Sequence, residues 1–137
     1  MTLAKMFVIG LIGGGLSLSG AFFFPTPSFA QQAAIKALDA DNDGTLDLGE
    51  VTKAAQIVFD RLEKDQDATL DRKEIGSRLN AKEFSAADPD KDTTLTKEEY
   101  VALAAKLFKQ ADVEGDGTLD ARELRSKAGR ALLRLIR

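Results

Sequence analysis

The chain has 137 residues, of which 19 are basic and 22 acidic, giving a formal net charge of −3. It contains no cysteine and no histidine, which excludes disulfides, thiol nucleophiles, histidine bases and ordinary zinc or copper sites. Any metal bound by this chain must therefore be held by oxygen ligands, and these suit hard cations.

Residues 1–30 differ in composition from the rest of the chain. Lys5 is their only charged residue, and an apolar stretch over 6–24 is followed by two prolines and a small-x-small ending at Ala30. This pattern predicts a secretory signal peptide cleaved after Ala30, and hence a periplasmic protein. The alternative is an uncleaved membrane anchor, because the apolar stretch is long for a signal peptide. No cysteine follows, so a lipoprotein anchor is excluded.

The remainder, residues 31–137, contains four copies of an acidic pattern centred on the dipeptide Thr-Leu. We name the copies loop 1 (39–50), loop 2 (63–74), loop 3 (88–99) and loop 4 (112–123); their starts lie 24, 25 and 24 residues apart. An apolar residue stands four positions before each start: Ile35, Phe59, Phe84 and Phe108. A disordered acidic tract has no reason to keep such anchors, whereas a helix entering each loop does.

Each copy resembles the twelve-residue EF-hand loop that binds calcium. Positions 1, 3 and 5 supply carboxylates, position 7 a backbone carbonyl, position 9 a direct or water-mediated ligand, and position 12 a bidentate glutamate. The predicted metal ligands are Asp39, Asp41, Asp43, Thr45, Asp47, Glu50, Glu63, Asp65, Asp67, Thr69, Asp71, Glu74, Asp88, Asp90, Asp92, Thr94, Thr96, Glu99, Asp112, Glu114, Asp116, Thr118, Asp120 and Glu123.

The four loops differ in how well they fit this pattern. Loop 1 satisfies every position, with Gly44 at position 6, where the backbone needs a positive φ. Loop 4 keeps a glycine there but has the longer Glu114 at position 3, and loop 3 has Thr93 in place of the glycine. Loop 2 departs twice, with Glu63 at position 1 and Ala68 at position 6. We therefore predict that loop 1 is the strongest site and loop 2 the weakest.

Charge at the ligand positions indicates which ion is preferred. Loops 1, 2 and 4 each place five carboxylates there, including an aspartate at position 9, whereas loop 3 places four and has Thr96 at position 9. Each carboxylate attracts a trivalent ion half again as strongly as a divalent ion at equal distance. The pattern therefore favours a highly charged cation, although acid-rich loops also occur in tight calcium sites.

The segments between the loops predict an all-α fold. They span only 12, 13 and 12 residues (51–62, 75–87 and 100–111), so each must be both the exit helix of one loop and the entry helix of the next. We expect a compact three-helix core with the four EF-hand loops joined by these short shared helices, plus short terminal helices. The core is small, so bound metal is expected to supply much of the folding free energy.

The tail after Glu123 is basic and amphipathic. Its cationic residues fall near one helical face and its apolar residues on another. It either contacts an anionic surface or partner, or forms a terminal helix that docks its apolar side and leaves its charges in solvent. The second interpretation is favoured.

Three features together resemble lanmodulin, the family of periplasmic lanthanide-binding proteins of methylotrophic bacteria. They are the short spacers, the aspartate at position 9 (Asp47, Asp71 and Asp120) and the terminal sequence ARELRSKAGRALLRLIR. The family's proline at position 2 is present only as Pro89. The resemblance implies selective binding of trivalent lanthanides, ordering of the chain on binding, and a role beside periplasmic alcohol dehydrogenases that use lanthanides.

The expected function is therefore selective binding of lanthanide(III) ions in the periplasm. The alternative is a periplasmic calcium-binding buffer or sensor, with Ca2+ in the same loops; a structural or interaction protein is a third class. No enzyme is expected, because the carboxylates are taken up by the loops and histidine and cysteine are absent. The expected partners are metal ions, with no nucleic acid and no stable membrane anchor after cleavage; a homodimer and a periplasmic protein partner both stay open.

Overall fold

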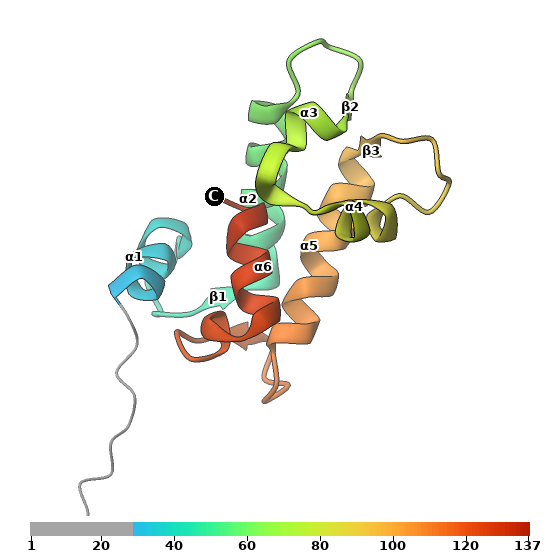
Figure 1. Cartoon of the computed structure of the whole chain (residues 1–137). Coiled ribbons are helices and arrows are strands. Elements are labelled where there is room, and N and C mark those ends of the chain that lie inside the picture. The colour runs from blue at the N-terminus through green and yellow to red at the C-terminus, as the bar shows by residue number, and fades with distance from the viewer. Residues whose placement is uncertain (1–28) are drawn as a thin grey trace, which may run out of the picture.

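The computed structural model describes residues 29–137, which are mostly helical (Figure 1). The helices are α1 (Phe29–Leu38), α2 (Leu48–Leu62), α3 (Arg72–Ile75), α4 (Ala81–Ala87), α5 (Lys97–Ala111) and α6 (Lys127–Leu135), with 3-10 turns η1 (Gly76–Arg78) and η2 (Glu123–Arg125). The strands are β1 (Leu46–Asp47), β2 (Thr69–Leu70), β3 (Leu95–Thr96) and β4 (Thr118–Leu119). The predicted all-α class is confirmed.

The predicted signal peptide lies outside the described residues, except that Phe29 and Ala30 begin α1. Among residues 29–137, no helix combines the length and the apolar character needed to cross a membrane.

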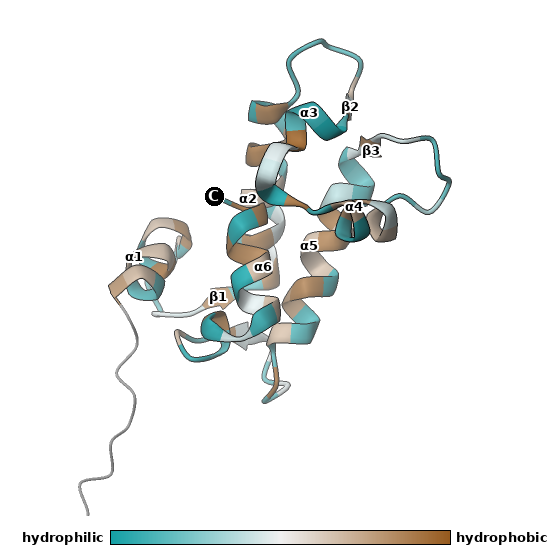
Figure 2. Ribbon diagram, in the orientation of Figure 1, coloured by the Kyte–Doolittle hydropathy of each residue, from teal (hydrophilic) through white to brown (hydrophobic). Residues whose placement is uncertain are grey.

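The core is formed by α2, α5 and α6. Their buried side chains include Phe59 of α2, Tyr100 of α5 and Leu132 of α6, and the Phe59 and Tyr100 rings meet edge to face with centroids 5.9 Å apart. Figure 2 shows α6 with one apolar and one polar side. Fully burying a large apolar side chain contributes about 1.5–3 kcal/mol, so this small cluster is the main stabilising element that the chain itself provides.

The C-terminal helix α6 packs into the core beside α2 and α5, together with the buried residues of the predicted segment 75–87. The Tyr100 hydroxyl donates to the Leu135 carbonyl (2.6 Å), and burial raises the pKa of Tyr100 to about 12. The Arg78 guanidinium donates to the carbonyls of Arg134 (2.7 Å) and Arg137. Both contacts satisfy carbonyls at the end of α6, where a helix lacks internal partners and favours positive charge. The tail thus docks its apolar side, as the favoured interpretation expected.

The segment predicted as one helix over 75–87 is divided into α3, η1 and α4. Gly76 adopts φ 56° and ψ −128°, a conformation open to glycine, and ends α3. Asn80 then caps α4 in a reciprocal capping box with Glu83. The apolar positions predicted to be buried in this segment are confirmed for Ile75 and Phe84, which both lie in the core.

The four loops pair with one another through their short strands. β1 of loop 1 pairs with β4 of loop 4 (Leu46 opposite Leu119), and β2 of loop 2 pairs with β3 of loop 3 (Leu70 opposite Leu95). Loops 1 and 2 lie at opposite ends of α2, and loops 3 and 4 lie at opposite ends of α5, so each pair is formed by loops from different long helices (Figure 1). The apolar residue at position 8 forms the pairing strand, as its sequence position suggests.

Candidate metal centres

All four loops curl through the same backbone conformation. Position 6 has positive φ in each, at Gly44 (87°), Ala68 (65°), Thr93 (72°) and Gly117 (86°). Position 4 also has positive φ, at Asn42 (62°), Gln66 (65°), Lys91 (59°) and Gly115 (71°), which the sequence analysis did not anticipate. Asn42 and Gly115 are residue types that tolerate a positive φ, so they were the sequence signals for this conformation at position 4. Ala68 and Thr93 adopt it against their intrinsic preference.

The residue at position 1 holds this curl by accepting backbone N–H groups. Asp39 accepts from Asn42 (2.5 Å) and Gly44 (2.9 Å), and the corresponding aspartate of loop 4, Asp112, accepts from Gly115 (2.6 Å) and Gly117 (3.1 Å). The longer Glu63 of loop 2 still accepts from position 4. The first ligand therefore also organises the turn that brings the other ligands near it.

The threonine at position 7 orients the carboxylate at position 5. In each loop its hydroxyl and its backbone N–H both donate to that aspartate, with hydroxyl distances of 2.7, 2.8, 2.8 and 3.0 Å. These threonines are Thr45, Thr69, Thr94 and Thr118, paired with Asp43, Asp67, Asp92 and Asp116. The repeated threonine therefore has a side-chain role beyond the backbone carbonyl predicted as its ligand.

Position 9 contacts the glutamate at position 12 in each loop, and in loops 1, 2 and 3 it also caps the helix that leaves the loop. The Asp47 carboxylate accepts from the Glu50 backbone (2.7 Å), and a Glu50 oxygen accepts from the Asp47 backbone (3.1 Å). Asp71 and Thr96 form the same reciprocal capping box with Glu74 and Glu99. Helix capping thus brings position 12 back to the loop.

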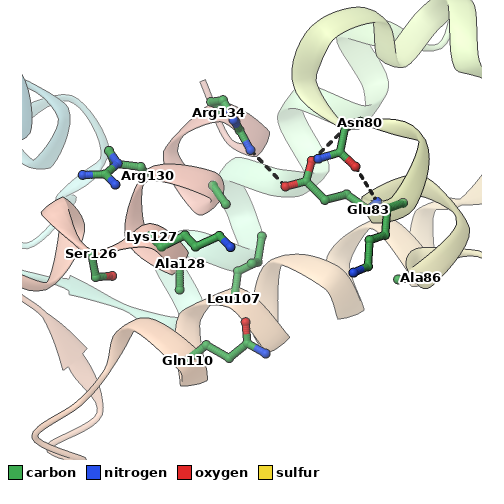
Figure 3. Close-up of a pocket in the computed structure, with 12 residues that line it drawn as sticks. Asn80, Glu83, Ala86, Leu107, Gln110, Ser126, Lys127, Ala128, Arg130 and Arg134 are labelled. Carbon is green, nitrogen blue, oxygen red and sulfur yellow. Dashed lines mark hydrogen bonds and ion pairs between the residues drawn. The ribbon is translucent and has the colours of Figure 1, made fainter.

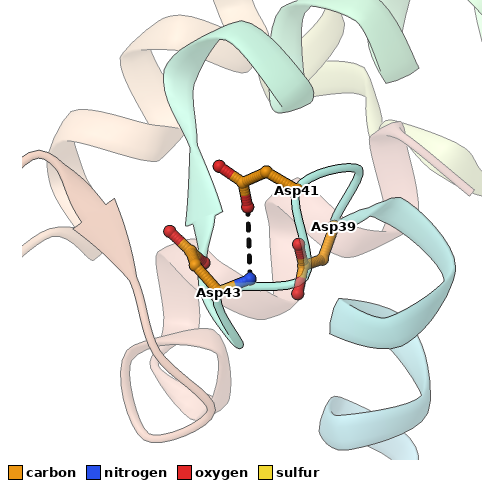
Figure 4. Close-up of side chains that lie close together, drawn as sticks. All are labelled: Asp39, Asp41 and Asp43. Carbon is orange, nitrogen blue, oxygen red and sulfur yellow. Dashed lines mark hydrogen bonds between the residues drawn. The ribbon is translucent and has the colours of Figure 1, made fainter.

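Three loops gather three carboxylates whose oxygens all lie within 4.8 Å of one another. The groups are Asp39, Asp41 and Asp43 of loop 1; Glu63, Asp65 and Glu74 of loop 2; and Asp88, Asp90 and Glu99 of loop 3. Figure 4 shows the loop 1 carboxylates, with Asp41 accepting from the Asp43 backbone at 3.2 Å. Such all-oxygen groups fit hard cations such as Ca2+ and lanthanides.

Two segments of the chain match the EF hand family model. They are residues 32–53 and 103–126, which contain loops 1 and 4. These are the loops that carry glycine at position 6 and pair through β1 and β4. No curated protein sequence matches the chain. The EF-hand matches and the carboxylate groups together support metal binding by this chain.

The pKa of the aspartate at position 3 is raised in loops 1 and 3. A backbone N–H from Asp43 lowers the pKa of Asp41, but desolvation and the charge of Asp43 outweigh it and the pKa is raised overall. A hydrogen bond shared with Asp88, together with desolvation, raises the pKa of Asp90. For Asp39, desolvation raises the pKa, but N–H donors bring it below its usual value. A cation among these carboxylates would relieve the repulsion.

Pro89 distinguishes loop 3 from the others. In loops 1, 2 and 4 the position-2 backbone N–H donates to the position-12 glutamate, as Lys64 does to Glu74 at 2.9 Å. A proline has no N–H to donate, so Glu99 receives no such bond; it joins Asp88 and Asp90 in the carboxylate group, as Glu74 does in loop 2 alongside its bond from Lys64. Proline at position 2 therefore removes an internal competitor for one ligand oxygen.

Loop 4 forms no such group of three within the described residues, and it is the loop in which Arg122 contacts two of the predicted ligands. Its guanidinium lies 3.1 Å from Glu114 and 3.2 Å from Asp120, the predicted ligands at positions 3 and 9. The hydrogen bond and charge of Asp120 raise the pKa of Arg122, so the arginine stays cationic. Loop 4 thus carries its own competing cation.

Replacing Arg122 with glutamine is expected to raise metal affinity at loop 4 by about three- to tenfold, because the competing charge is removed. Calorimetric titration with lanthanum measures this in a background where Asp41, Asp65 and Asp90 are each changed to asparagine, which weakens loops 1–3. Lys127→Gln removes an equal charge from outside the loop and is the control. An equal gain in that variant would show that net charge, not the Arg122 contacts, sets the affinity.

Proposed function

We propose that this protein is a periplasmic metal-binding protein that binds trivalent lanthanide ions selectively in its EF-hand loops and becomes ordered on binding. The observation that carries the proposal is the loop 1 group of Asp39, Asp41 and Asp43, with Asp47 and Glu50 at its edge. Five carboxylates around one ion leave less excess charge with a trivalent than with a divalent cation. No catalytic step is proposed.

Asp47 is central because its role as a helix cap can be separated from its charge. One carboxylate oxygen, Oδ1, accepts from the Glu50 backbone, which leaves Oδ2 for an ion or its bound water. Asparagine caps helices about as well as aspartate. Asp47→Asn therefore removes a negative charge from the loop while keeping the start of α2.

The wild-type protein is expected to prefer lanthanum to calcium by about tenfold or more at its best site, and Asp47→Asn is expected to reduce that preference, because charge discriminates between ions of similar size. The preference is measured by a calorimetric competition experiment, in which lanthanum is titrated into calcium-loaded wild type and into calcium-loaded Asp47→Asn. Glu83→Gln, which removes one acidic charge from α4 outside the loops and keeps a residue type that can complete the capping box with Asn80, is the control.

Comparable affinities of the wild type for the two ions would instead make this a calcium buffer or sensor, the alternative that the EF-hand matches also support. A preference unchanged in Asp47→Asn would keep the metal assignment and remove the charge at position 9 as its cause.

A further inference from the structure

A groove lies between α4, α5 and the start of α6, away from the carboxylate groups. Its volume is about 880 Å³. Figure 3 shows the side chains of α4 and α6 facing each other, with Leu107 of α5 between them. A smaller hollow of about 160 Å³ shares Leu107 and Ala131 and adds Leu79 and Leu103, so the apolar floor continues along α5.

The walls of this groove are cationic. Lys82 of α4 and Lys127, Arg130 and Arg134 of α6 line it, against one carboxylate, Glu83, which pairs with Arg134 at 3.1 Å. All four cationic residues are exposed. The whole chain has a net charge of −3, so this surface is opposite in sign to the protein that carries it.

We propose that this groove binds an acidic, amphipathic segment of a partner protein. The exposed cations would contact its carboxylates and the floor its apolar residues, a known way of recognising acidic motifs. The charge of the groove favours an acidic ligand, because its lining has three more cationic than anionic side chains. These lie on α4 and α6, which face each other across an apolar floor.

The shape and lining of the groove disfavour other anionic ligands. A bilayer needs apolar side chains that protrude, and the large exposed apolar residues of the described chain (Phe29, Leu48, Ile57 and Val113) all lie outside the groove. No aromatic side chain lines it, so a single-stranded nucleic acid would find no stacking platform. The acidic loops of a second copy would be partly neutralised by their own metal ions, which weakens their attraction to the cationic walls.

The test uses a fluorescein-labelled synthetic peptide with glutamate and leucine at helical spacing, and a lysine-for-glutamate version as the reversed-charge control. Anisotropy is measured on lanthanum-saturated protein from which free metal has been removed, because the helices that form the groove are expected to need bound metal. Wild-type protein is expected to bind only the acidic peptide, and Lys82→Glu/Lys127→Glu, which carries the same metal loops and would bridge through metal equally well, to lose about tenfold in affinity. The matched control, Lys53→Glu/Arg61→Glu, reverses two exposed charges of α2 and is expected to bind as the wild type does.

Circular dichroism shows whether each variant is folded. If the double charge reversal disturbs the helices, the milder Lys82→Gln/Lys127→Gln is used instead, and it is expected to lose an intermediate amount of affinity for the acidic peptide. Equal binding by the groove variants and the wild type would overturn the proposal, as would no binding of the acidic peptide. It would also be overturned by binding only to vesicles of anionic lipid, or by a dimer that dissociates in Lys82→Glu/Lys127→Glu, since each places a different occupant in the groove. None of these outcomes depends on metal selectivity.

Discussion

Replacing Gly129 with alanine is expected to lower the free energy of unfolding by about 1–3 kcal/mol, the usual cost of forcing extra volume into a packed core. Gly129 is buried in α6, and an added Cβ would lie 2.5 Å from the Leu124 Cα, 2.8 Å from the Leu124 carbonyl carbon, and closer still to the Glu123 carbonyl oxygen. These are backbone atoms, so a side-chain rotation cannot relieve the clash. Thermal or urea unfolding measures the loss.

The same change is expected to weaken metal binding by loop 4, because the displaced backbone belongs to Glu123, the predicted ligand at position 12. Lys127→Ala, at an exposed position of the same helix, is the control and is expected to leave both stability and metal binding nearly unchanged. An alanine at position 129 with wild-type stability would mean that α6 does not pack against η2 as described here.

Changing Asp41 to asparagine is expected to reduce the affinity of the tightest class of sites by about tenfold, whereas Asp65→Asn is expected to cost about threefold or less, because the field around Asp65 is already weakened by nearby cations. Both residues occupy position 3 and both are exposed. Loop 1 contains no cationic residue, whereas loop 2 contains Lys64, Arg72 and Lys73. Calorimetric titration with lanthanum compares the two variants directly.

Loop 2 forms its carboxylate group despite Glu63 and Ala68, so its predicted weakness rests on charge and on the backbone strain at Ala68. A greater loss for Asp65→Asn than for Asp41→Asn would reverse this ranking. It would then place the strongest site where the helices are shortest, beside α3 and α4.

The repeat pattern predicted the loops and their apolar anchors because both depend on local sequence. The four threonine-leucine pairs mark the short strands, and the anchors Ile35, Phe59, Phe84 and Phe108 are all buried. The division of segment 75–87 was missed because apolar spacing alone places Ile75 and Phe84 correctly in a broken or an unbroken helix. Gly76 and the Asn80–Glu83 capping box were the local signals for the break.

Long-range features could not be taken from the sequence. The docking of α6 in the core involves Tyr100 and Arg78, which reach the end of α6 from 35 and 56 positions away. The contact of Arg122 with both Glu114 and Asp120 depends on the curl of loop 4, in which positions 3, 9 and 11 approach one another. Composition shows the charges, but only the folded loop shows which of them are already paired.

The central claim is that metal binding orders the chain. The most direct test treats residues 31–137 with chelator, removes the chelator, and then titrates in lanthanum while circular dichroism records the helicity. The loops concentrate carboxylates that repel one another, and the core is small, so metal binding is expected to supply folding free energy. We predict low helicity in chelator and a rise that saturates at no more than four ions per chain, one for each loop. Equal helicity in chelator and in lanthanum, with no ion bound, would contradict the account.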